Sequence, residues 1–341
     1  MKKVVVAMSG GVDSSVAAFL LKREGYDVTG ITMKLWDTQC AADARKTASA
    51  LGIDHHVVDL RKAFRRDVVG YFCSEYLHGR TPNPCIMCNN RIKFGILLDK
   101  AKSLGARLLA TGHYVRLYRP LNGRYRIREG VDKFKDQSYF LFALRQRQLA
   151  RLLFPLGKYT KGEVRDVAAK AGLILPGHTR ESQDICFLAG GDYRRFLKRE
   201  CKGIKPGRVK DLSGQCLGSH KGTAFYTIGQ RQGLGIAAGK PLYVVKLDAA
   251  KNEVVLATAE DLKARELTVT DVSWMGIGNP GKPFRALAKI RYNHKKSPCR
   301  IIPLSPRKVK AIFDSPQHAI TPGQAFVFYR GQDVAGGGWI S

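Results

Sequence analysis

The chain has 341 residues, of which 44% are hydrophobic and 9% aromatic, a composition that predicts a globular protein of two or three domains and excludes a disordered one. Its 58 lysines and arginines against 28 acidic residues give a net charge of +30, which predicts a large polyanion as partner, with a solvated basic surface as the alternative. No apolar run approaches the ~20 residues that span a bilayer, and eight cysteines are too few for a secreted disulfide scaffold, so we expect a cytoplasmic protein without a membrane partner.

The first predicted elements are a strand, a glycine turn and a helix. Lys2 to Met8 form a β-branched apolar run that is typical of a buried strand; Ser9, Gly10 and Gly11 interrupt it, and Asp13 to Ser15 open an apolar-periodic helix. Adjacent glycines let backbone N–H groups approach an anion, and the helix adds the positive end of its dipole. This order predicts a pyrophosphate site, with an ordinary capped turn as the alternative. A Walker P-loop and a dinucleotide fold are not supported.

Strands and helices then alternate up to about residue 200. The alternation predicts an open parallel sheet wrapped by helices, with ligands at the carboxyl ends of the strands, where Ser9 to Asp13, Met33 and Thr111 to Tyr114 would lie. Asn122-Gly123 predicts the turn of a hairpin, and Thr160 with Glu163 predicts a helix capping box. The predicted strands are 27–36, 54–58, 107–110, 115–118 and 124–128, and the predicted helices are 41–51, 64–76, 91–104, 146–153, 160–171 and 192–199.

Beyond residue 200, glycine-rich turns separate short alternating segments, which predicts a β-rich second half. The predicted strands there are 223–228, 242–247, 253–257, 286–292, 308–313 and 325–329. A break near 262–266 divides this half in two. The predicted fold is therefore an α/β domain over 1–200, a small β-rich middle domain over 201–264 and a C-terminal β-barrel or sandwich over 265–341.

The cysteines suggest a second chemistry. Between Leu77 and Asn90 two prolines predict an extended path up to Cys85, which forms a Cys-x-x-Cys pair with Cys88, while Cys186 lies in another polar stretch. Such a pair indicates sulfur chemistry or metal binding, but a structural zinc would need four ligands and no second pair follows. The other cysteines stand alone, and we expect them to be buried or idle thiols: Cys40, Cys73, Cys201, Cys216 and Cys299.

The loop Ser9-Gly-Gly-Val-Asp-Ser14 resembles that of the ATP pyrophosphatases, which adenylylate a substrate oxygen. Over nearly its whole length the chain resembles the bacterial tRNA-specific 2-thiouridylases (the MnmA family), which replace the 2-oxygen of the wobble uridine with sulfur. The matching stretches are 8–14, 79–84, 88–89, 92–95, 110–114, 135–141, 182–186, 228–235, 290–292 and 336–340. The family resemblance implies an adenine nucleotide α-hydrolase-like first domain. It also implies ATP and Mg²⁺ as cofactors, and tRNA and a persulfide-carrying sulfur donor protein as partners.

The resemblance also implies roles for single residues. Cys88 would be the nucleophile and Cys186 the persulfide carrier, and the target base would meet Asn83, Pro84 and Cys85. ATP would be bound by Ala7, Met8, Ser9, Gly10, Gly11, Val12, Asp13, Ser14, Met33 and Gly112. The tRNA would be contacted by His113, Lys135, Asp136, Gln137, Arg291, Tyr292 and Gln324, although His113 could instead be a structural histidine.

The chain departs from the family pattern in two places. The stretch 36–43 is shorter than usual, and Cys85 stands where many relatives have an aspartate. A site of three thiolates, Cys85, Cys88 and Cys186, could hold an iron–sulfur cluster, so the persulfide route and the cluster remain alternatives. Two other functions also remain open: a pyrophosphatase-loop enzyme acting on a small molecule, and an inactive RNA-binding relative.

Overall fold

The computed structural model describes residues 1–36, 40–121, 123–173, 185–188, 191–237 and 239–341. Three parts of the sequence discussed above lie outside the described residues: 37–39, Asn122 of the hairpin turn, and Ser182 to Asp184 of the stretch 182–186.

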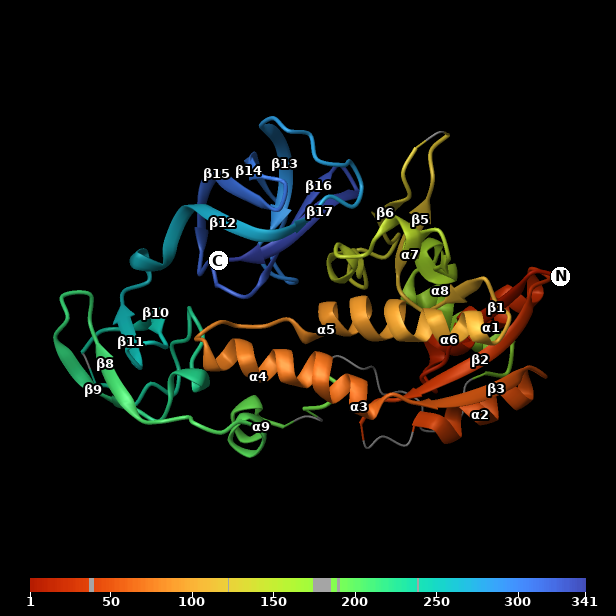
Figure 1. Ribbon diagram of the computed structural model, residues 1–341, viewed down its shortest axis with the longest axis horizontal. Helices are drawn as coiled ribbons and strands as arrows, with labels where there is room; N and C mark the ends of the chain where they lie inside the picture. Colours follow the sequence, from red (N-terminus) through yellow and green to blue (C-terminus); the bar gives the residue numbers. More distant parts are fainter. Residues whose placement is uncertain (37–39, 122, 174–184, 189–190, 238) are drawn as a thin grey trace.

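The first sheet is parallel and has the order β3-β2-β1-β4-β7. Its central strand is buried on both sides, because Val5 packs into one hydrophobic cluster and Val4 and Val6 pack into another. Helices α1, α2 and α8 cover the second face, and α6 covers the first, which confirms the predicted open parallel sheet wrapped by helices (Figure 1). The elements are β1 (Lys3–Ala7), α1 (Val12–Arg23), β2 (Asp27–Lys34), α2 (Cys40–Ala50), β3 (Asp54–Asp59), α6 (Leu97–Ser103), β4 (Leu108–Ala110), β7 (Leu152–Leu153) and α8 (Lys161–Lys170).

Two long composite helices lie beside this sheet, and each has a π-helical part. The first consists of α3 (Arg61–Phe64), η1 (Arg65–Val69) and α4 (Gly70–Leu77), and the second of α5 (Pro84–Met87), η2 (Cys88–Ile96) and α6. The extended path predicted up to Cys85 ends earlier, at Asn83, so the prediction was wrong for Pro84 and Cys85, where the helix has already begun. Proline is favoured at the first helical position, where its missing N–H would have no partner anyway. Cys85 and Cys88 therefore lie on the first turns of a helix.

The predicted helix 146–153 is also shorter than expected. Helix α7 (Gln146–Leu149) ends early because Leu152 and Leu153 pair with β4 as an edge strand. The capping box of α8 is confirmed, since Thr160 Oγ1 accepts a hydrogen bond from the Glu163 backbone N–H and the Glu163 carboxylate accepts one from the Thr160 backbone N–H. The remaining short elements are η3 (Ser138–Leu141), η4 (Pro155–Lys158), α9 (Tyr193–Glu200) and η6 (Glu260–Leu262).

The middle sheet has the order β10-β11-β8-β9. Its strands are β8 (Gly207–Lys210), β9 (Cys216–His220), β10 (Tyr243–Asp248) and β11 (Glu253–Ala257). The strand predicted at 223–228 was wrong, because η5 (Thr223–Phe225) is a 3₁₀ turn there. The consecutive residues Ala224, Phe225 and Tyr226 are all buried, whereas a half-buried strand would turn every second side chain outward.

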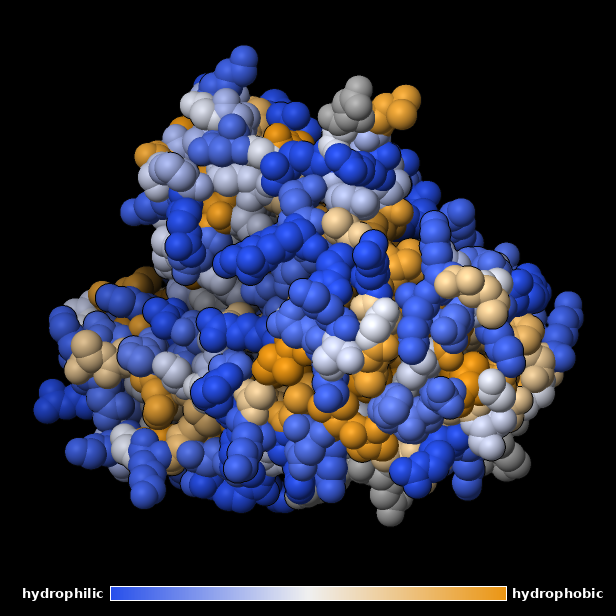
Figure 2. Space-filling view, turned by 45° about the vertical axis from the view of Figure 1, so that its right-hand side comes forward, coloured by the Kyte–Doolittle hydropathy of each residue, from blue (hydrophilic) through white to orange (hydrophobic). Residues whose placement is uncertain are grey.

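The third sheet closes into the predicted barrel, since β12 pairs with both β15 and β17. Its antiparallel strands are β12 (Lys263–Ser273), β13 (Phe284–Lys289), β14 (Ser297–Ser305), β15 (Lys308–His318), β16 (Ala325–Arg330) and β17 (Asp333–Ile340). Hydrophilic side chains cover most of the face shown in Figure 2. No helix in the described part of the chain has both the length and the apolar character to cross a membrane.

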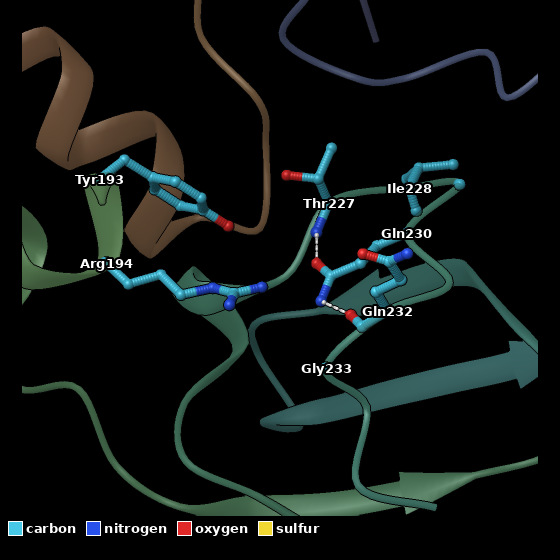
Figure 3. A pocket seen from close by; sticks show the side chains of 8 residues that line it. Tyr193, Arg194, Thr227, Ile228, Gln230, Gln232 and Gly233 are labelled. Carbon is cyan, nitrogen blue, oxygen red and sulfur yellow. Dashed lines mark hydrogen bonds between the residues drawn. The ribbon is translucent and has the colours of Figure 1, made fainter. Parts of the chain in front are cut away.

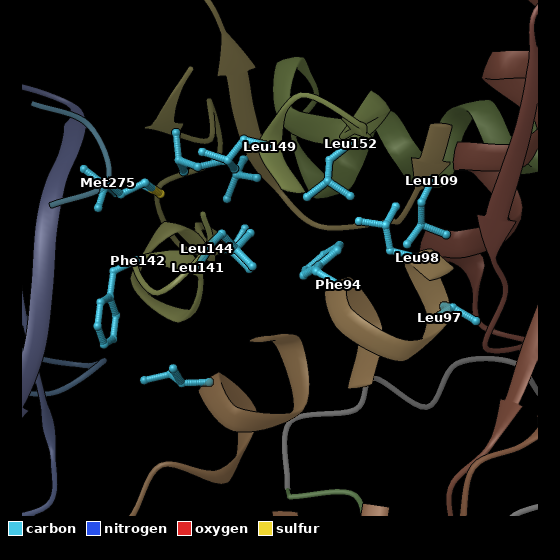
Figure 4. Close-up of a cluster of buried hydrophobic side chains, with 14 of the residues drawn as sticks. Phe94, Leu97, Leu98, Leu109, Leu141, Phe142, Leu144, Leu149, Leu152 and Met275 are labelled. Atoms are coloured by element: carbon cyan, nitrogen blue, oxygen red, sulfur yellow. The ribbon is translucent and has the colours of Figure 1, made fainter. Parts of the chain in front are cut away.

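The N-terminal unit and the barrel share a sheet and a core. The predicted hairpin is present as β5 (Val115–Tyr118) and β6 (Arg126–Glu129), and β6 continues the barrel sheet by pairing Arg128 with Asp333 of β17. Ile127 of β6 belongs to the same hydrophobic cluster as Phe142 and as Met275 of the barrel side. Figure 4 shows Phe142 beside Met275. No pattern in the sequence predicts this connection.

Candidate nucleotide and thiol site

The glycine loop connects β1 to α1 at the carboxyl edge of the parallel sheet, where it was predicted. Its shape is held by Ser14, whose Oγ accepts a hydrogen bond from the Ser9 N–H at 3.1 Å and donates one to the Gly11 carbonyl at 2.9 Å. Gly11 is the N-cap of α1 and provides no side-chain cap, so this helix terminus retains free N–H groups that suit an anion. The loop thus brings together Ala7 to Ser14, and Met33 lies near the carboxyl end of the neighbouring strand β2.

Asp13 is held by two segments that are distant in sequence. Its Oδ1 accepts a hydrogen bond from the Tyr114 hydroxyl at 2.6 Å and one from Lys161 Nζ at 2.7 Å. Gly112 permits this approach, because a Cβ at that position would lie 3.0 Å from the Asp13 backbone carbon. An ammonium and a carboxylate therefore stand beside the free helix N-terminus. The ammonium favours a polyphosphate, and the carboxylate is a ligand type that Mg²⁺ accepts.

Lys161 is a site residue that the sequence analysis missed. It follows the capping residue Thr160 and is the first residue of α8, and its backbone N–H is fixed by Asp132 Oδ2 at 2.9 Å. The capping box predicts where α8 begins but says nothing about what the next side chain touches.

The three candidate thiols lie close enough for a thiolate at one to raise the pKa of another. Cys85 is exposed on the first turn of α5, and Cys88, 8% exposed, begins η2 on the same helical face. Cys186 is also exposed, and its neighbour Phe187 anchors it by packing against Phe72 with ring centroids 5.2 Å apart. Within the described residues, however, no three His, Cys, Asp or Glu side chains are arranged to hold a metal ion.

The surrounding protein atoms control the protonation of these thiols. Burial raises the pKa of Cys88 to about 12, and partial removal from water raises the pKa values of Cys85 and Cys186, although both residues keep exposed surface. Lys93 lowers the pKa of all three thiols, but this loss of contact with water outweighs it. Lys93 is five residues after Cys88 in the π-helix, where hydrogen bonds join residues five apart and so place Lys93 beneath Cys88. At neutral pH Cys88 is therefore a protonated thiol in the free protein.

The segment that carries Asn83 and Pro84 is fastened to the barrel. The Thr81 N–H donates to the Pro322 carbonyl at 2.8 Å, and Gln324 Nε2 donates to the Thr81 carbonyl at 2.9 Å. Gly323 packs so closely that a Cβ would lie 2.9 Å from the Thr81 nitrogen. Gln324, a predicted tRNA contact, thus uses its amide to position the predicted base-binding loop.

The other predicted tRNA contacts gather where the N-terminal unit meets the barrel. The Tyr292 hydroxyl donates to the backbone carbonyl of Asp136 at 3.2 Å, and Gln137 Oε1 accepts from the Tyr114 N–H at 3.1 Å. The Asp136 side chain is buried, which raises its pKa, and it accepts hydrogen bonds from the Gly130 and Ser138 N–H groups.

Lys135 precedes this buried turn, and on the barrel side Arg291 donates to the His318 carbonyl at 3.2 Å. His113 is 8% exposed, and burial holds its pKa well below the usual value. Its Nδ1 is 2.7 Å from Thr111 Oγ1, an arrangement that favours the structural alternative for this histidine.

Three family profiles cover the chain in order. Residues 2–190 match the family described as tRNA methyl transferase HUP domain. Residues 194–258 match the tRNA methyl transferase PRC-barrel domain, and residues 264–340 match the aminomethyltransferase beta-barrel domain.

Similar proteins carry a consistent name. The chain is 49% identical over 354 residues to the tRNA-specific 2-thiouridylase MnmA of Pelotomaculum thermopropionicum, which covers 99% of this chain and 97% of the relative. It is 49% identical over 356 residues to the tRNA-specific 2-thiouridylase MnmA of Carboxydothermus hydrogenoformans, and this match covers 99% of this chain and 97% of the relative. Among solved structures, a 4-thiouridine synthetase in complex with RNA and ATP is 18% identical with a TM-score of 0.39, covering 58% of this chain and 50% of that chain. This last similarity is too low to support an argument about function.

Proposed function

Because this chain belongs to the tRNA-specific 2-thiouridylase family, we propose that it is an ATP-dependent sulfurtransferase that converts the wobble uridine of tRNA into 2-thiouridine. The observation that carries the proposal is the proximity of two chemistries in the N-terminal unit. A glycine loop with a free helix N-terminus lies at the carboxyl edge of the sheet, and Cys88 belongs to a hydrophobic cluster against which Met33 and Val58 pack, near the carboxyl ends of β2 and β3.

The first step activates the base. The uridine 2-oxygen attacks the α-phosphate of ATP, pyrophosphate leaves, and the base carries an O-adenylyl group. This step is needed because a carbonyl oxygen is a poor leaving group, whereas AMP is a good one. The loop N–H groups and Lys161 would hold the departing pyrophosphate, and Asp13 would bind Mg²⁺, which neutralises phosphate charge when bound.

The second step delivers sulfur as a persulfide. A donor protein transfers a sulfur atom to Cys186, and the terminal sulfur of this persulfide attacks C2 and displaces AMP together with the former 2-oxygen. Cys88 Sγ then attacks Cys186 Sγ, which breaks the sulfur–sulfur bond and releases 2-thiouridine, and the Cys88 thiol proton passes to N3 of the departing base. A disulfide between Cys88 and Cys186 remains and must be reduced by an external thiol.

An iron–sulfur cluster fits the described geometry less well, since Cys85, Cys88 and Cys186 are not arranged as a metal site. The proposed reaction therefore uses a persulfide on Cys186 and no iron–sulfur cluster. Anaerobic purification with iron and sulfide assays tests this choice. Metal-free protein that thiolates tRNA at full rate supports the persulfide route, and activity proportional to bound iron contradicts it.

The whole assignment is tested by incubating the protein with ATP, a sulfur source and tRNA. We expect pyrophosphate release that depends on tRNA, and 2-thiouridine in the tRNA by mass spectrometry. Pyrophosphate release with a small molecule instead of tRNA would identify a different pyrophosphatase-loop enzyme. Binding of tRNA without pyrophosphate release would identify an inactive relative.

A further inference from the structure

A shallow cavity of about 670 Å³, wide open to solvent, lies between α9 and the loop that precedes β10 (Figure 3). Much of its wall comes from the stretch 228–235, which matches the family but has no role in the mechanism above. The lining residues are Tyr193, Arg194, Thr227, Ile228, Gly229, Gln230, Gln232 and Gly233.

This cavity lies beside the predicted base-binding loop. Thr81, two residues before Asn83, donates from its hydroxyl to Thr227 Oγ1 at 3.4 Å. The barrel adjoins the same wall, because a Cβ on Gly229 would lie 2.9 Å from Ala319 Cβ. Segments of all three units therefore meet at the cavity, within a few residues of the site that receives the target base.

The lining groups suit a nucleotide. Among the described residues that line the cavity none carries a carboxylate, and Arg194 extends its guanidinium toward the loop 227–233 in Figure 3. Its Nε donates to the Phe225 carbonyl at 3.1 Å. Its terminal N–H groups form a fork that matches a phosphate. Gln232 is exposed and carries an amide that can meet a base edge.

Hydrogen bonds and ring stacking within the protein already hold the residues that line the cavity in place before a ligand binds. Gln230 Oε1 accepts from the Thr227 N–H at 3.3 Å and Gln230 Nε2 donates to the Gln232 carbonyl at 2.9 Å, so this amide shapes the loop. Tyr193 is stacked on Tyr76 with centroids 5.0 Å apart, and its hydroxyl donates to the Phe225 carbonyl at 3.0 Å.

We propose that this cavity binds a nucleotide adjacent to the target uridine, with Arg194 on its phosphate and Gln232 on its base. The proposal rests on the function proposed above, and it makes the cavity a determinant of which anticodon loops are accepted. Extrusion of the target base places its neighbours against the surface that borders the base-binding loop, and here that surface carries the Arg194 guanidinium and the amides of Gln230 and Gln232.

The test is a double-mutant cycle between protein and RNA. Thiolation of an anticodon stem-loop is measured as kcat/KM for wild type, Arg194→Met and Gln232→Glu, with Arg195→Met as the matched control. Arg195 is the exposed neighbour on the same helix and does not line the cavity. Thermal melting checks that each variant is folded, and Arg194→Lys keeps a cation at the site.

We expect Arg194→Met to lower kcat/KM at least about tenfold and Arg195→Met less than about threefold. Two further RNAs lack the base 5′ or 3′ of the target uridine. On the RNA that lacks the base bound by Gln232, the Gln232→Glu substitution should lower kcat/KM by less than about twofold. Equal losses for Arg194→Met and Arg195→Met, or a Gln232→Glu loss that is the same on every RNA, would overturn the proposal. A fall in kcat/KM of Arg194→Met with the sulfur donor protein but not with inorganic sulfide would also overturn the proposal, because this surface would then bind the donor protein and not the RNA.

A second measurement does not depend on activity. RNA with 5-iodouridine beside the target is irradiated with the wild-type protein, and the crosslinked peptide is identified by mass spectrometry. We expect the crosslink within 193–194 or 227–233. Specific RNA binding with crosslinks elsewhere removes this inference and leaves the proposed function standing, whereas absence of any RNA-dependent pyrophosphate release removes the proposed function itself.

Discussion

Replacing Gly323 by alanine tests whether the barrel positions the base-binding loop. Gly323 has φ +86°, and a Cβ there would lie 2.8 Å from Arg80 Cβ and 2.9 Å from the Thr81 nitrogen. Ordinary contact begins near 3.4 Å, so the loop must retreat by about 0.6 Å, the difference between 3.4 and 2.8 Å. Because a misplacement approaching 1 Å at a reacting centre costs about 10²-fold, we expect tRNA-dependent pyrophosphate release to fall by about 10- to 100-fold.

Gly331→Ala is the matched control. Gly331 also lies in the barrel with a positive φ, +61°, but nothing lies within 4 Å of its added Cβ. Both variants should lose about 1–2 kcal/mol of unfolding free energy in urea from backbone strain, and both should bind ATP normally. Only Gly323→Ala should lose turnover, while Gly331→Ala stays within about twofold of wild type. Equal kcat values for the two variants would refute the positioning role.

Three further predictions concern the loop and the thiols. Gly11→Val should keep the fold, since the nearest atom to its Cβ is 3.6 Å away, yet lose ATP binding in calorimetry because the side chain blocks the anion; normal binding would contradict the anion site. With its pKa raised to about 12, Cys88 should react with iodoacetamide at pH 8 about 10³-fold more slowly than an ordinary cysteine, and the rate should rise about tenfold per pH unit; rapid labelling in peptide mapping would refute the burial argument. Cys186→Ser should release pyrophosphate normally but form no 2-thiouridine, and a variant that still thiolates tRNA would exclude Cys186 as the sulfur carrier.

The same raised pKa has a consequence for stability. The folded protein keeps the Cys88 proton that the unfolded chain releases near the ordinary value of 9.0. The free energy of unfolding that comes from keeping this proton is therefore fully present below pH 9 and is lost as the pH rises toward 12.

Local patterns predicted the parts of the site that depend on neighbours in sequence. The buried valine run, the glycine turn and the capped start of α8 each combine residues within a few positions of one another, and all appear in the structure. Backbone conformation and burial periodicity operate over this short range, so one sequence is enough to identify them.

The rest of the site depends on contacts between distant segments. Lys161 reaches Asp13 across 148 positions, and Gln324 reaches the Thr81 carbonyl across 243. No periodicity encodes such pairs. The helix start at Pro84 was missed for another reason, because the same proline is compatible with an extended segment or with the first helical turn, and packing of Ile86 in the core decides between them.

The pairing of β6 with β17 also affects how the chain folds during synthesis. The hairpin leaves the ribosome long before Asp333, which is the residue that pairs with Arg128 and accepts its hydrogen bond at 2.7 Å. Until then the edge of β6 is unpaired and the cluster around Ile127 and Phe142 lacks its barrel side chains. The nascent N-terminal unit therefore exposes a strand edge and part of its hydrophobic cluster until β17 has been synthesised, and such surfaces favour association with other chains.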